Sequence, residues 1–573
     1  MLIEHGEGYV QYTGGSIWEQ AVKILADAGC EAVVGLPTDE WGLLDAAAAS
    51  RVIRAIPVRD QRIGACLAVG FATIVHRPVV LALSSGPSFA NALAGLVEAA
   101  SLAAPIVIIT NRIPVSSLGR GGFQELEQAR MAETLLRWHI RVEEPASLAW
   151  ALRRAVHMSL NGGGELSFVE ITDEVSHQKF EEPTLHGAVS RLAALPAEAA
   201  LEHAIGICVK ARRPLILLGG GAWAAGAVAL EFAQCWSAPI FTTASGRGSI
   251  DETHDLACGL VGLYATPPAD QLLAQADVVL VVGSKLEETA RMGWEHLAHC
   301  TLVQIDATVE TFGLGASPDL CLLGDATLTV QALATRLMQH ADQLCTEASW
   351  KEHISSVKQQ LLATYSTASF ATAPVRATFR AINTVFGTES IFVQENGLHD
   401  IWGYHYPVLT IGAGGCVVLP GEQTTMGFGL PAALGAALST SERAVVAICG
   451  DGALGMNFSA LLTARELGCG LTVIVFDNRG FGWPRFCRRI EGVTDVLTHF
   501  QIPLPIAELA LAYGCRIAQP ENDHELLATL HNARRISAEG GIALVRIAVN
   551  NEDDLPVGVQ GIFGATPEQE HKT

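Results

Sequence analysis

Short apolar runs recur along the whole chain, and longer segments with helical spacing separate them. Runs of this kind are buried on both faces, which is typical of strands in parallel sheets covered by helices on either side. The pattern therefore predicts an α/β fold built from doubly wound parallel sheets. The clearest runs are EAVVGL (31–36), RPVVLALSS (77–85), APIVIIT (104–110), PLILLGG (214–220), DVVLVVGS (277–284), AVVAICG (444–450) and LTVIVFDN (471–478).

The chain is too long for a single hydrophobic core, because 573 residues exceed the usual size of one domain. Its composition changes at 181–200 and again at 341–360, where strand-like runs are missing. We expect three α/β domains of similar size and a polar tail. The predicted ranges are 1–182, 195–345 and 370–550, with the tail at 551–573.

Charge and composition exclude several classes of partner. The net charge is −22, from 59 acidic and 37 basic side chains, and this disfavours nucleic acid because phosphate binding needs a basic face. The N-terminal segment lacks the apolar core of a signal peptide, and no apolar run is long enough to span a bilayer. Thirteen cysteines are scattered without a CxxC pair, which is typical of a reducing compartment. We expect a cytoplasmic protein with neither a nucleic-acid nor a membrane partner.

A carboxylate stands at the end of one apolar strand, and a carboxamide stands at the end of the next strong one. Asp451 follows VVAICG and Asn478 follows LTVIVFD, and a helix between them makes their loops neighbours at one sheet edge. Both side chains offer hard oxygens, which Mg²⁺ prefers. Glycines at 450, 452 and 480 let a bulky ligand approach, and a helix after Gly452 offers free N–H groups to a phosphate.

A purely structural interpretation competes with the metal site, since Asp451 could cap a helix and Asn478 could form a turn. Either residue alone would favour that interpretation. The two together favour a magnesium ion that holds a diphosphate.

The stretch GDGALGMNFSALLTARELGCGLTVIVFDN (450–478) resembles the signature of thiamin-diphosphate-dependent enzymes, and Asp477 stands where that family usually has a first asparagine. The resemblance implies that Asp451, Asn478 and the backbone carbonyl of Gly480 bind Mg²⁺. It extends over nearly the whole chain, and the central domain is similar to that of acetolactate-synthase-like enzymes. The segments that carry it are LSSGPSFANALAGLVEAA (83–100), GGFQELEQ (121–128), TTASGRGSID (242–251) and TTMGFGLPAALGAAL (424–438).

This resemblance implies pyrimidine-binding, central and diphosphate-binding domains, in that order, and a role for several further residues. Met426 would lie under the cofactor and force its folded conformation. Phe123 and Gln124 would line the substrate side, and three arginines at 485, 488 and 489 could meet a substrate carboxylate or face solvent. The residues expected around the diphosphate are Asn396, His399, Gly450, Gly452 and Ala453.

One position departs from the family pattern. The segment VRDQRIGACLAVGFA (58–72) carries Gln61 where these enzymes usually have a glutamate that protonates the pyrimidine ring. An amide has no such proton to exchange, and the adjacent Asp60 should point elsewhere. Three interpretations stay open: an active enzyme in which cofactor ionisation is slower but sufficient, an enzyme with different proton chemistry, or a protein that binds cofactor without catalysis. Glyoxylate carboligase, a member of the resembled family, also lacks the acid at this place. Because the metal-binding residues are intact, we favour an enzyme.

The resemblance implies decarboxylation of a 2-keto acid followed by carboligation, as in acetolactate synthase, with thiamin diphosphate and Mg²⁺ as cofactors. The alternatives are a 2-keto acid decarboxylase, a glyoxylate carboligase-like enzyme, or a catalytically weak homologue. In this family the active site lies between two chains, so we expect a homodimer or a homotetramer.

The glycine turn in PLILLGGGAWAAG (214–226) could also bind a dinucleotide, although the acid that NAD binding needs is missing from the next strand. FAD in the central domain is possible but not supported, and Lys285 stands where relatives often have arginine.

Overall fold

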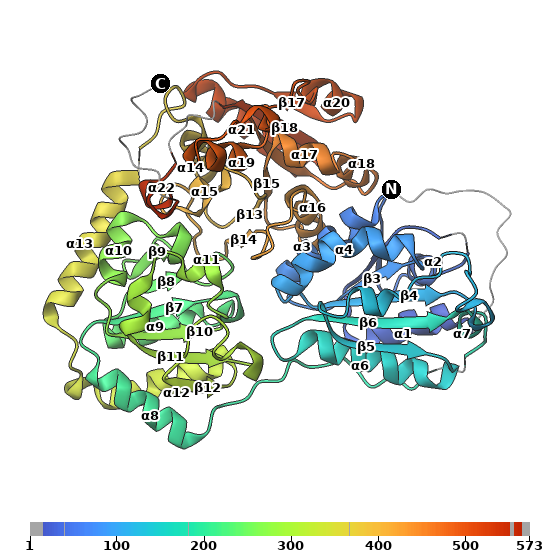
Figure 1. Cartoon of the computed structure of the whole chain (residues 1–573), viewed down its shortest axis with the longest axis horizontal. Coiled ribbons are helices and arrows are strands. Elements are labelled where there is room, and N and C mark those ends of the chain that lie inside the picture. The colour runs from blue at the N-terminus through green and yellow to red at the C-terminus, as the bar shows by residue number, and fades with distance from the viewer. Residues whose placement is uncertain (1–14, 39, 181–182, 366, 550–554, 564–573) are drawn as a thin grey trace.

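The computed structural model describes residues 15–38, 40–180, 183–365, 367–549 and 555–563, and it contains three parallel sheets of six strands each (Figure 1). The predicted fold class is confirmed. Every paired strand in the three sheets runs parallel to its neighbour. The inner strands are buried, whereas the edge strands β2, β5, β12 and β17 are partly exposed.

The first sheet has the order β2-β1-β3-β4-β6-β5, with helices on both faces. Its strands are β1 (Ala32–Gly35), β2 (Arg54–Pro57), β3 (Val79–Leu83), β4 (Ile106–Arg112), β5 (Leu136–Val142) and β6 (Leu166–Thr172). The helices are α1 (Ile17–Ala28), α2 (Leu43–Ser50), α3 (Gln61–Val75), α4 (Pro87–Ser101), α5 (Gln128–Met131), α6 (Leu148–Leu160) and α7 (Asp173–Ser176).

The third sheet repeats this topology, in the order β14-β13-β15-β16-β18-β17. Its strands are β13 (Ile391–Gln394), β14 (Cys416–Val418), β15 (Val445–Gly450), β16 (Leu471–Asp477), β17 (Arg516–Ala518) and β18 (Ile542–Ala548). The helices are α14 (Pro374–Phe386), α15 (Asp400–Tyr404), α16 (Gly429–Ser439), α17 (Asp451–Asn457), α18 (Ala460–Glu466), α19 (Gly482–Ile490), α20 (Ile506–Ala512) and α21 (Asp523–Ala538).

The central sheet has a different order, β12-β11-β10-β7-β8-β9, which is the order of dinucleotide-binding folds. Its strands are β7 (Pro214–Leu218), β8 (Ile240–Thr242), β9 (Ala257–Leu260), β10 (Val278–Val282), β11 (Thr301–Asp306) and β12 (Leu320–Leu323). The helices are α8 (Glu198–Lys210), α9 (Gly226–Trp236), α10 (Pro267–Leu273), α11 (Glu288–Arg291) and α12 (Ala326–Gln339), and α13 (Ala348–Tyr365) leads to the third domain.

Helices α3 and α16 join the first domain to the third by close backbone contact (Figure 1). A Cβ added to Gly70 would lie 2.0 Å from the carbonyl oxygen of Ala432, and one added to Gly435 would lie 2.0 Å from that of Leu67. Because the residue numbers rise on one helix as they fall on the other, the two helices run antiparallel. The N-terminus of α3 therefore lies beside the C-terminus of α16.

Part of the predicted tail is helical. Helix α22 (Val557–Ile562) lies against the central domain, and Val559 is fully buried there, while 550–554 and 564–573 lie outside the described residues. No helix in the described part of the chain is long and apolar enough to cross a membrane.

Candidate functional site

Asp451 and Asn478 lie at the carboxyl ends of two hydrogen-bonded strands. β15 and β16 pair in parallel with Gly450 opposite Phe476, so the loops that follow them are neighbours, as expected from the sequence. Asp451 is only 2% exposed. Its Oδ2 and the Oδ1 of Asn478 are buried oxygens that no hydrogen-bond donor of the described residues reaches. Two unsatisfied oxygens on neighbouring loops fit a cation.

The protonation of Asp451 depends on its surroundings. Burial first, and then the nearby charge of Asp477, raise the pKa of Asp451 to about 7, although N–H groups of Gly452 and Gly480 donate to it and act in the opposite direction. A divalent cation beside the carboxylate would favour the ionised form and supply the missing partner. The donor set of carboxylate, carboxamide and backbone carbonyl is the hard-oxygen set that Mg²⁺ takes.

His399 lies over the turn that leads into Asp451. Its segment follows β13, the strand next to β15, and a Cβ on Gly450 would lie 3.3 Å from the Cε1 of His399. Burial lowers the pKa of His399 to about 3, so the ring is neutral, and its Nε2 is a further buried atom without a partner among the described residues. Asn396, on the same segment, donates from Nδ2 to the carbonyl of Thr424 at 2.7 Å.

Two of the glycines expected at the site are packed too closely against other residues to carry a side chain without a shift. A Cβ on Gly452 would lie 3.1 Å from the ring of Phe481, and one on Gly480 would lie 2.1 Å from the carbonyl oxygen of Thr498. Gly452 and Ala453 belong to the first turn of α17. The strand ends thus place the predicted residues Asn396, His399, Gly450, Asp451, Gly452, Ala453, Asn478 and Gly480 at one edge of the third sheet.

Family models match this chain in all three domains. A thiamine pyrophosphate enzyme N-terminal TPP binding domain matches 16–131, a central domain of the same enzymes matches 201–333, and their C-terminal TPP binding domain matches 395–547. The chain belongs to the thiamine pyrophosphate enzymes. Thiamine pyrophosphate is another name for thiamin diphosphate, so the family predicted from the signature is confirmed.

Curated relatives of this thiamine pyrophosphate enzyme match it over nearly its full length. It is 24% identical to the acetolactate synthase large subunit of Lactococcus lactis over 566 residues, which cover 96% of this chain and 95% of the relative. It is also 24% identical to the acetolactate synthase isozyme 3 large subunit of Escherichia coli over 561 residues, which cover 95% of this chain and 96% of the relative.

Glu395 is a residue of the site that the sequence analysis missed. It directly follows β13 and is fully buried, and its carboxylate accepts hydrogen bonds from the N–H groups of Gly427 (3.1 Å) and Gly429 (2.7 Å). Burial raises the pKa of Glu395 to about 7, and the backbone donors oppose this. These bonds fix the loop that carries Met426. A carboxylate directly after a buried strand, as in FVQE, was the available signal.

A second missed carboxylate, Glu98 of α4, comes from the first domain and is also fully buried. It accepts hydrogen bonds from the N–H groups of Gly421 and Thr425, on the other side of Met426. Two buried acids from different domains therefore hold the half-buried Met426 loop.

Gln61 lies at the opposite end of α16 from Met426 within one chain. It is the first residue of α3, where Asp60 caps the helix by accepting from the N–H groups of Arg62 and Ile63. The antiparallel packing puts Gln61 beyond the C-terminus of α16, whereas Met426 precedes its N-terminus. At a rise of about 1.5 Å per residue, α16 separates the two by roughly 16 Å.

Phe123 and Gln124 lie in a loop of the first domain, between β4 and α5. Phe123 is 85% exposed, and Gln124 adopts a left-handed backbone with φ of +58°.

The three arginines that follow the 478–480 loop bind the chain segment that comes after them. Arg485 is buried and donates to the carbonyl of Thr498 at 3.3 Å, and Arg489 pairs with Asp495 at 3.2 Å. Arg488 donates to the carbonyl of Thr494 at 3.4 Å. Their guanidinium groups thus bind the 494–498 segment, which lies next to Gly480.

A separate pocket opens at the carboxyl ends of β1, β3 and β4 in the first domain. The same strand positions in the third domain carry Asp451 and Asn478, since the two sheets share one topology. The pocket is lined by Glu40 and Asp45, whose negative charges would repel a diphosphate. The diphosphate site is therefore expected in the third domain.

Proposed function

We propose that this chain catalyses decarboxylation of a 2-keto acid followed by carboligation of the product to a second carbonyl compound, with thiamin diphosphate and Mg²⁺ as cofactors. The observation that carries the proposal is the pair of unsatisfied buried oxygens of Asp451 and Asn478 at neighbouring strand ends. The near full-length similarity to acetolactate synthase large subunits supports the reaction class.

The residues of this chain have distinct tasks in the proposal. Asp451, Asn478 and the carbonyl of Gly480 hold Mg²⁺, and the N–H groups at the start of α17 face the diphosphate. Glu395 and Glu98 keep the Met426 loop in place. When bound, thiamin diphosphate supplies an electron sink for cleavage of a C–C bond next to a carbonyl group.

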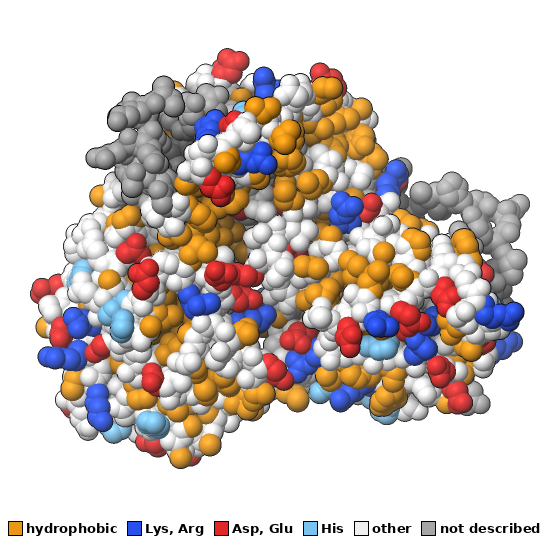
Figure 2. Space-filling view, in the orientation of Figure 1, with side chains coloured by type: hydrophobic (Ala, Val, Ile, Leu, Met, Phe, Trp, Pro, Cys, Tyr) orange, Lys and Arg blue, Asp and Glu red, His pale blue; other side chains and the backbone are white. Residues whose placement is uncertain are grey.

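The proposed site needs a second copy of the chain. Gln61 and Met426 lie at opposite ends of α16, so one chain cannot bring both to a single cofactor. Hydrophobic side chains gather on the visible face of the third domain (Figure 2). Four exposed hydrophobic side chains follow the 478–480 loop in the chain: Val493, Val496, Leu497 and Ile502. They would be covered in a homodimer or homotetramer.

Subunit mixing tests this arrangement. Asp451→Asn and Phe123→Ala variants change residues on opposite sides of the proposed interface. Each variant alone is expected to be inactive or weak, and mixed dimers should regain part of the activity because one of their two sites is intact. No recovery after verified subunit exchange would contradict a shared site.

Calorimetry and turnover test the function itself. We expect thiamin diphosphate to bind in the presence of Mg²⁺ and CO₂ to be released from pyruvate, glyoxylate or a longer 2-keto acid. Asp451→Asn should lose binding, and the matched control Asp495→Asn, an acid on the nearby 494–498 segment, should retain it. Absence of cofactor binding to the wild type would refute the proposal.

A cofactor-binding protein with weak catalysis is the second candidate, and Gln61 is the observation that favours it. Its Oε1 accepts a hydrogen bond from Asn91 Nδ2 at 3.3 Å. An amide can form hydrogen bonds of this kind, but it cannot transfer a proton to a ring nitrogen as a carboxylic acid can. Cofactor binding without CO₂ release from any of the three keto acids would support this candidate.

The cytoplasm is the proposed location, since all thirteen cysteines are free thiols and most are buried. A flavin is not part of the proposal. Lys285, at the position where relatives often have arginine, donates to the carbonyl of Ser101 in the first domain at 3.3 Å. Its ammonium group therefore forms a contact between two domains. The visible absorption spectrum of the purified protein would show a bound flavin directly.

A further inference from the structure

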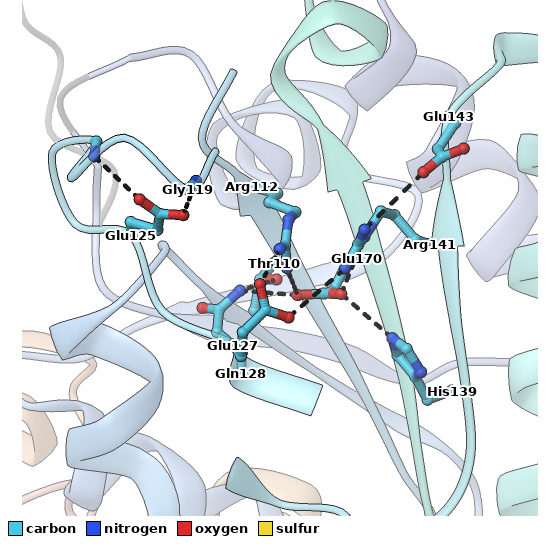
Figure 3. A network of polar contacts seen from close by, with 11 residues as sticks. Thr110, Arg112, Gly119, Glu125, Glu127, Gln128, His139, Arg141, Glu143 and Glu170 are labelled. Carbon is cyan, nitrogen blue, oxygen red and sulfur yellow. Dashed lines mark hydrogen bonds and ion pairs between the residues drawn. The ribbon is translucent and has the colours of Figure 1, made fainter. Parts of the chain in front are cut away.

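Glu170 is a fully buried carboxylate at the centre of a polar network in the first domain (Figure 3). It lies on β6, and its partners come from β4, β5 and α5. A buried charge is costly unless several donors satisfy it. The oxygens of Glu170 therefore depend on the donors that surround them.

The two oxygens of Glu170 have different partners. Oε1 accepts from Arg112 Nη1 and from Gln128 Nε2, each at 3.1 Å. Oε2 faces His139 Nε2 at 3.2 Å and Arg141 Nε at 3.5 Å. Burial acts to raise the pKa of Glu170, but the hydrogen bonds from His139 and Gln128 and the two arginine charges outweigh it and lower that pKa. The carboxylate is thus ionised and fixed.

Gln128 is held in one orientation by this carboxylate. Its Nε2 donates to Glu170 and also lies 3.3 Å from Thr110 Oγ1. Its Oε1 must then point the other way, where it accepts the N–H of Gly86 at 3.1 Å. The side chain of Gln128 is almost completely buried, so no solvent competes for these contacts.

Gly86 in turn supports Gln124. Gly86 has a left-handed backbone with φ of +67°, and a Cβ there would lie 2.7 Å from the carbonyl oxygen of Gln124. Gln124 is itself left-handed, a conformation that costs energy for a residue with a side chain. Glu125 closes the loop by accepting from the N–H groups of Gly119 and Gly122 (Figure 3).

We propose that Gln128 and Glu170 are positioning residues that hold Gly86 and the Phe123–Gln124 segment in the conformation that meets the substrate. The chain of contacts runs from Glu170 through Gln128 to Gly86 and from Gly86 to Gln124. Arg112 extends it, because its Nη2 donates to Glu127 at 2.6 Å, next to Gln128. The role given to Phe123 and Gln124 in this inference rests on the proposed function. The first test below does not depend on that function.

Hydrogen exchange without any ligand is the first test. Gln128→Met keeps the size of the side chain and removes the contacts to Gly86 and Glu170. We expect amide exchange in peptides covering 84–89 and 119–126 to become about tenfold faster, the effect of losing one hydrogen bond of ordinary strength. The matched control is Arg141→Met, which contacts the same carboxylate on its other oxygen and should leave both peptides unchanged.

Kinetics form the second test. Gln128→Met is expected to lower kcat/KM for the 2-keto acid about tenfold, while the affinity for thiamin diphosphate with Mg²⁺ stays within about twofold of the wild type. Arg141→Met should change neither value. If Gln128→Met does not fold, Thr110→Val removes only the contact from Nε2 to Oγ1 and should shift both measurements in the same direction by a smaller factor.

Two results would overturn the inference. One is unchanged exchange in both peptides of folded Gln128→Met protein. The other is an equal effect of Arg141→Met, which would mean that the network acts on stability alone. If the wild-type protein turns over no keto acid, the proposed function fails, whereas the exchange experiment still decides whether Gln128 positions the segment.

Discussion

Arg546 donates from Nε to Asp477 Oδ2 at 2.7 Å, and Asp477 lies directly beside Asp451. Asp477 occupies the position where the resembled signature has a neutral asparagine, so it brings an additional negative charge to the proposed magnesium site. Its charge is one of the causes that raise the pKa of Asp451. Arg546, which comes from β18, balances that charge at close range.

Removal of this balancing charge should strengthen cation binding. Arg546→Met leaves Asp477 unpaired near the metal, and a unit charge several ångströms from a divalent ion in a partly buried site is worth at least about 1.4 kcal/mol. We expect Tb³⁺, a luminescent probe for such sites, to bind about tenfold more tightly to Arg546→Met than to the wild type.

The double variant Asp477→Asn/Arg546→Met restores the neutral asparagine and should return the Tb³⁺ affinity to near the wild-type value. Arg516→Met is the charge control, because Arg516 is exposed on the edge strand β17 and solvent screens it. Equal affinities of Arg546→Met and wild-type protein would show that the pair has no influence on the metal.

Gln61→Glu should increase the rate of proton exchange at C2 of bound thiamin diphosphate. A glutamate in the same place can donate a proton to the pyrimidine ring, and glutamine cannot. Deuterium exchange at C2, followed by NMR with cofactor and Mg²⁺ at saturation, measures this step apart from turnover. Asp60→Asn is the control, since it changes the helix cap next to Gln61 and should leave the exchange rate unchanged. Equal rates in wild type and Gln61→Glu would mean that residue 61 has no role in ionising the cofactor.

The sequence was sufficient for the fold class, for the strands with the longest apolar runs, and for the neighbouring positions of Asp451 and Asn478. An unbroken apolar strand followed by a glycine turn defines where a strand ends, and parallel connectivity then leaves few places for the next strand. The binding of Mg²⁺ by these two residues stays a prediction, because the structure gives their positions and not their ligand.

Contacts between residues far apart in the chain could not be predicted from the sequence. Glu98 meets Gly421, and Gln128 meets Gly86, through tertiary packing that no local spacing encodes. The antiparallel packing of α3 on α16, which separates Gln61 from Met426, could not be predicted either. The sequence around Gly70 and Gly435 does not indicate which residues they contact.

Gly70→Ala should destabilise the junction between the first and third domains. The added methyl group would overlap the carbonyl of Ala432 at 2.0 Å, and neither backbone can yield without moving a helix. We expect a loss of about 1–3 kcal/mol in the free energy of unfolding, measured by urea denaturation. Gly206→Ala is the matched control, because Gly206 is exposed within α8 with no atom close to the added methyl group. It should gain up to about 1 kcal/mol from helix propensity.

Lys358 of α13 is buried between the central and third domains. Its Nζ donates to the carbonyls of Glu252 at 2.8 Å and Ala257 at 2.6 Å, and it lies 4.0 Å from the centroid of the Tyr406 ring. Burial lowers the pKa of Lys358 to about 8 from its ordinary value of 10.5. A neutral amine still has two N–H groups, which are enough for both carbonyls.

The stability of the protein should therefore depend on pH through Lys358. Between about pH 8 and pH 10 the unfolded chain keeps the proton and the folded chain has lost it, so rising pH favours the folded state by up to about 1.4 kcal/mol per pH unit. The difference in unfolding free energy between wild type and Lys358→Met should grow in favour of the wild type over this window and be flat below it. Because all other groups are common to both proteins, their titration cancels in the difference. Lys210→Met, at an exposed position of α8, should show no such slope. Parallel curves for wild type and Lys358→Met would mean that the folded protein keeps this lysine charged.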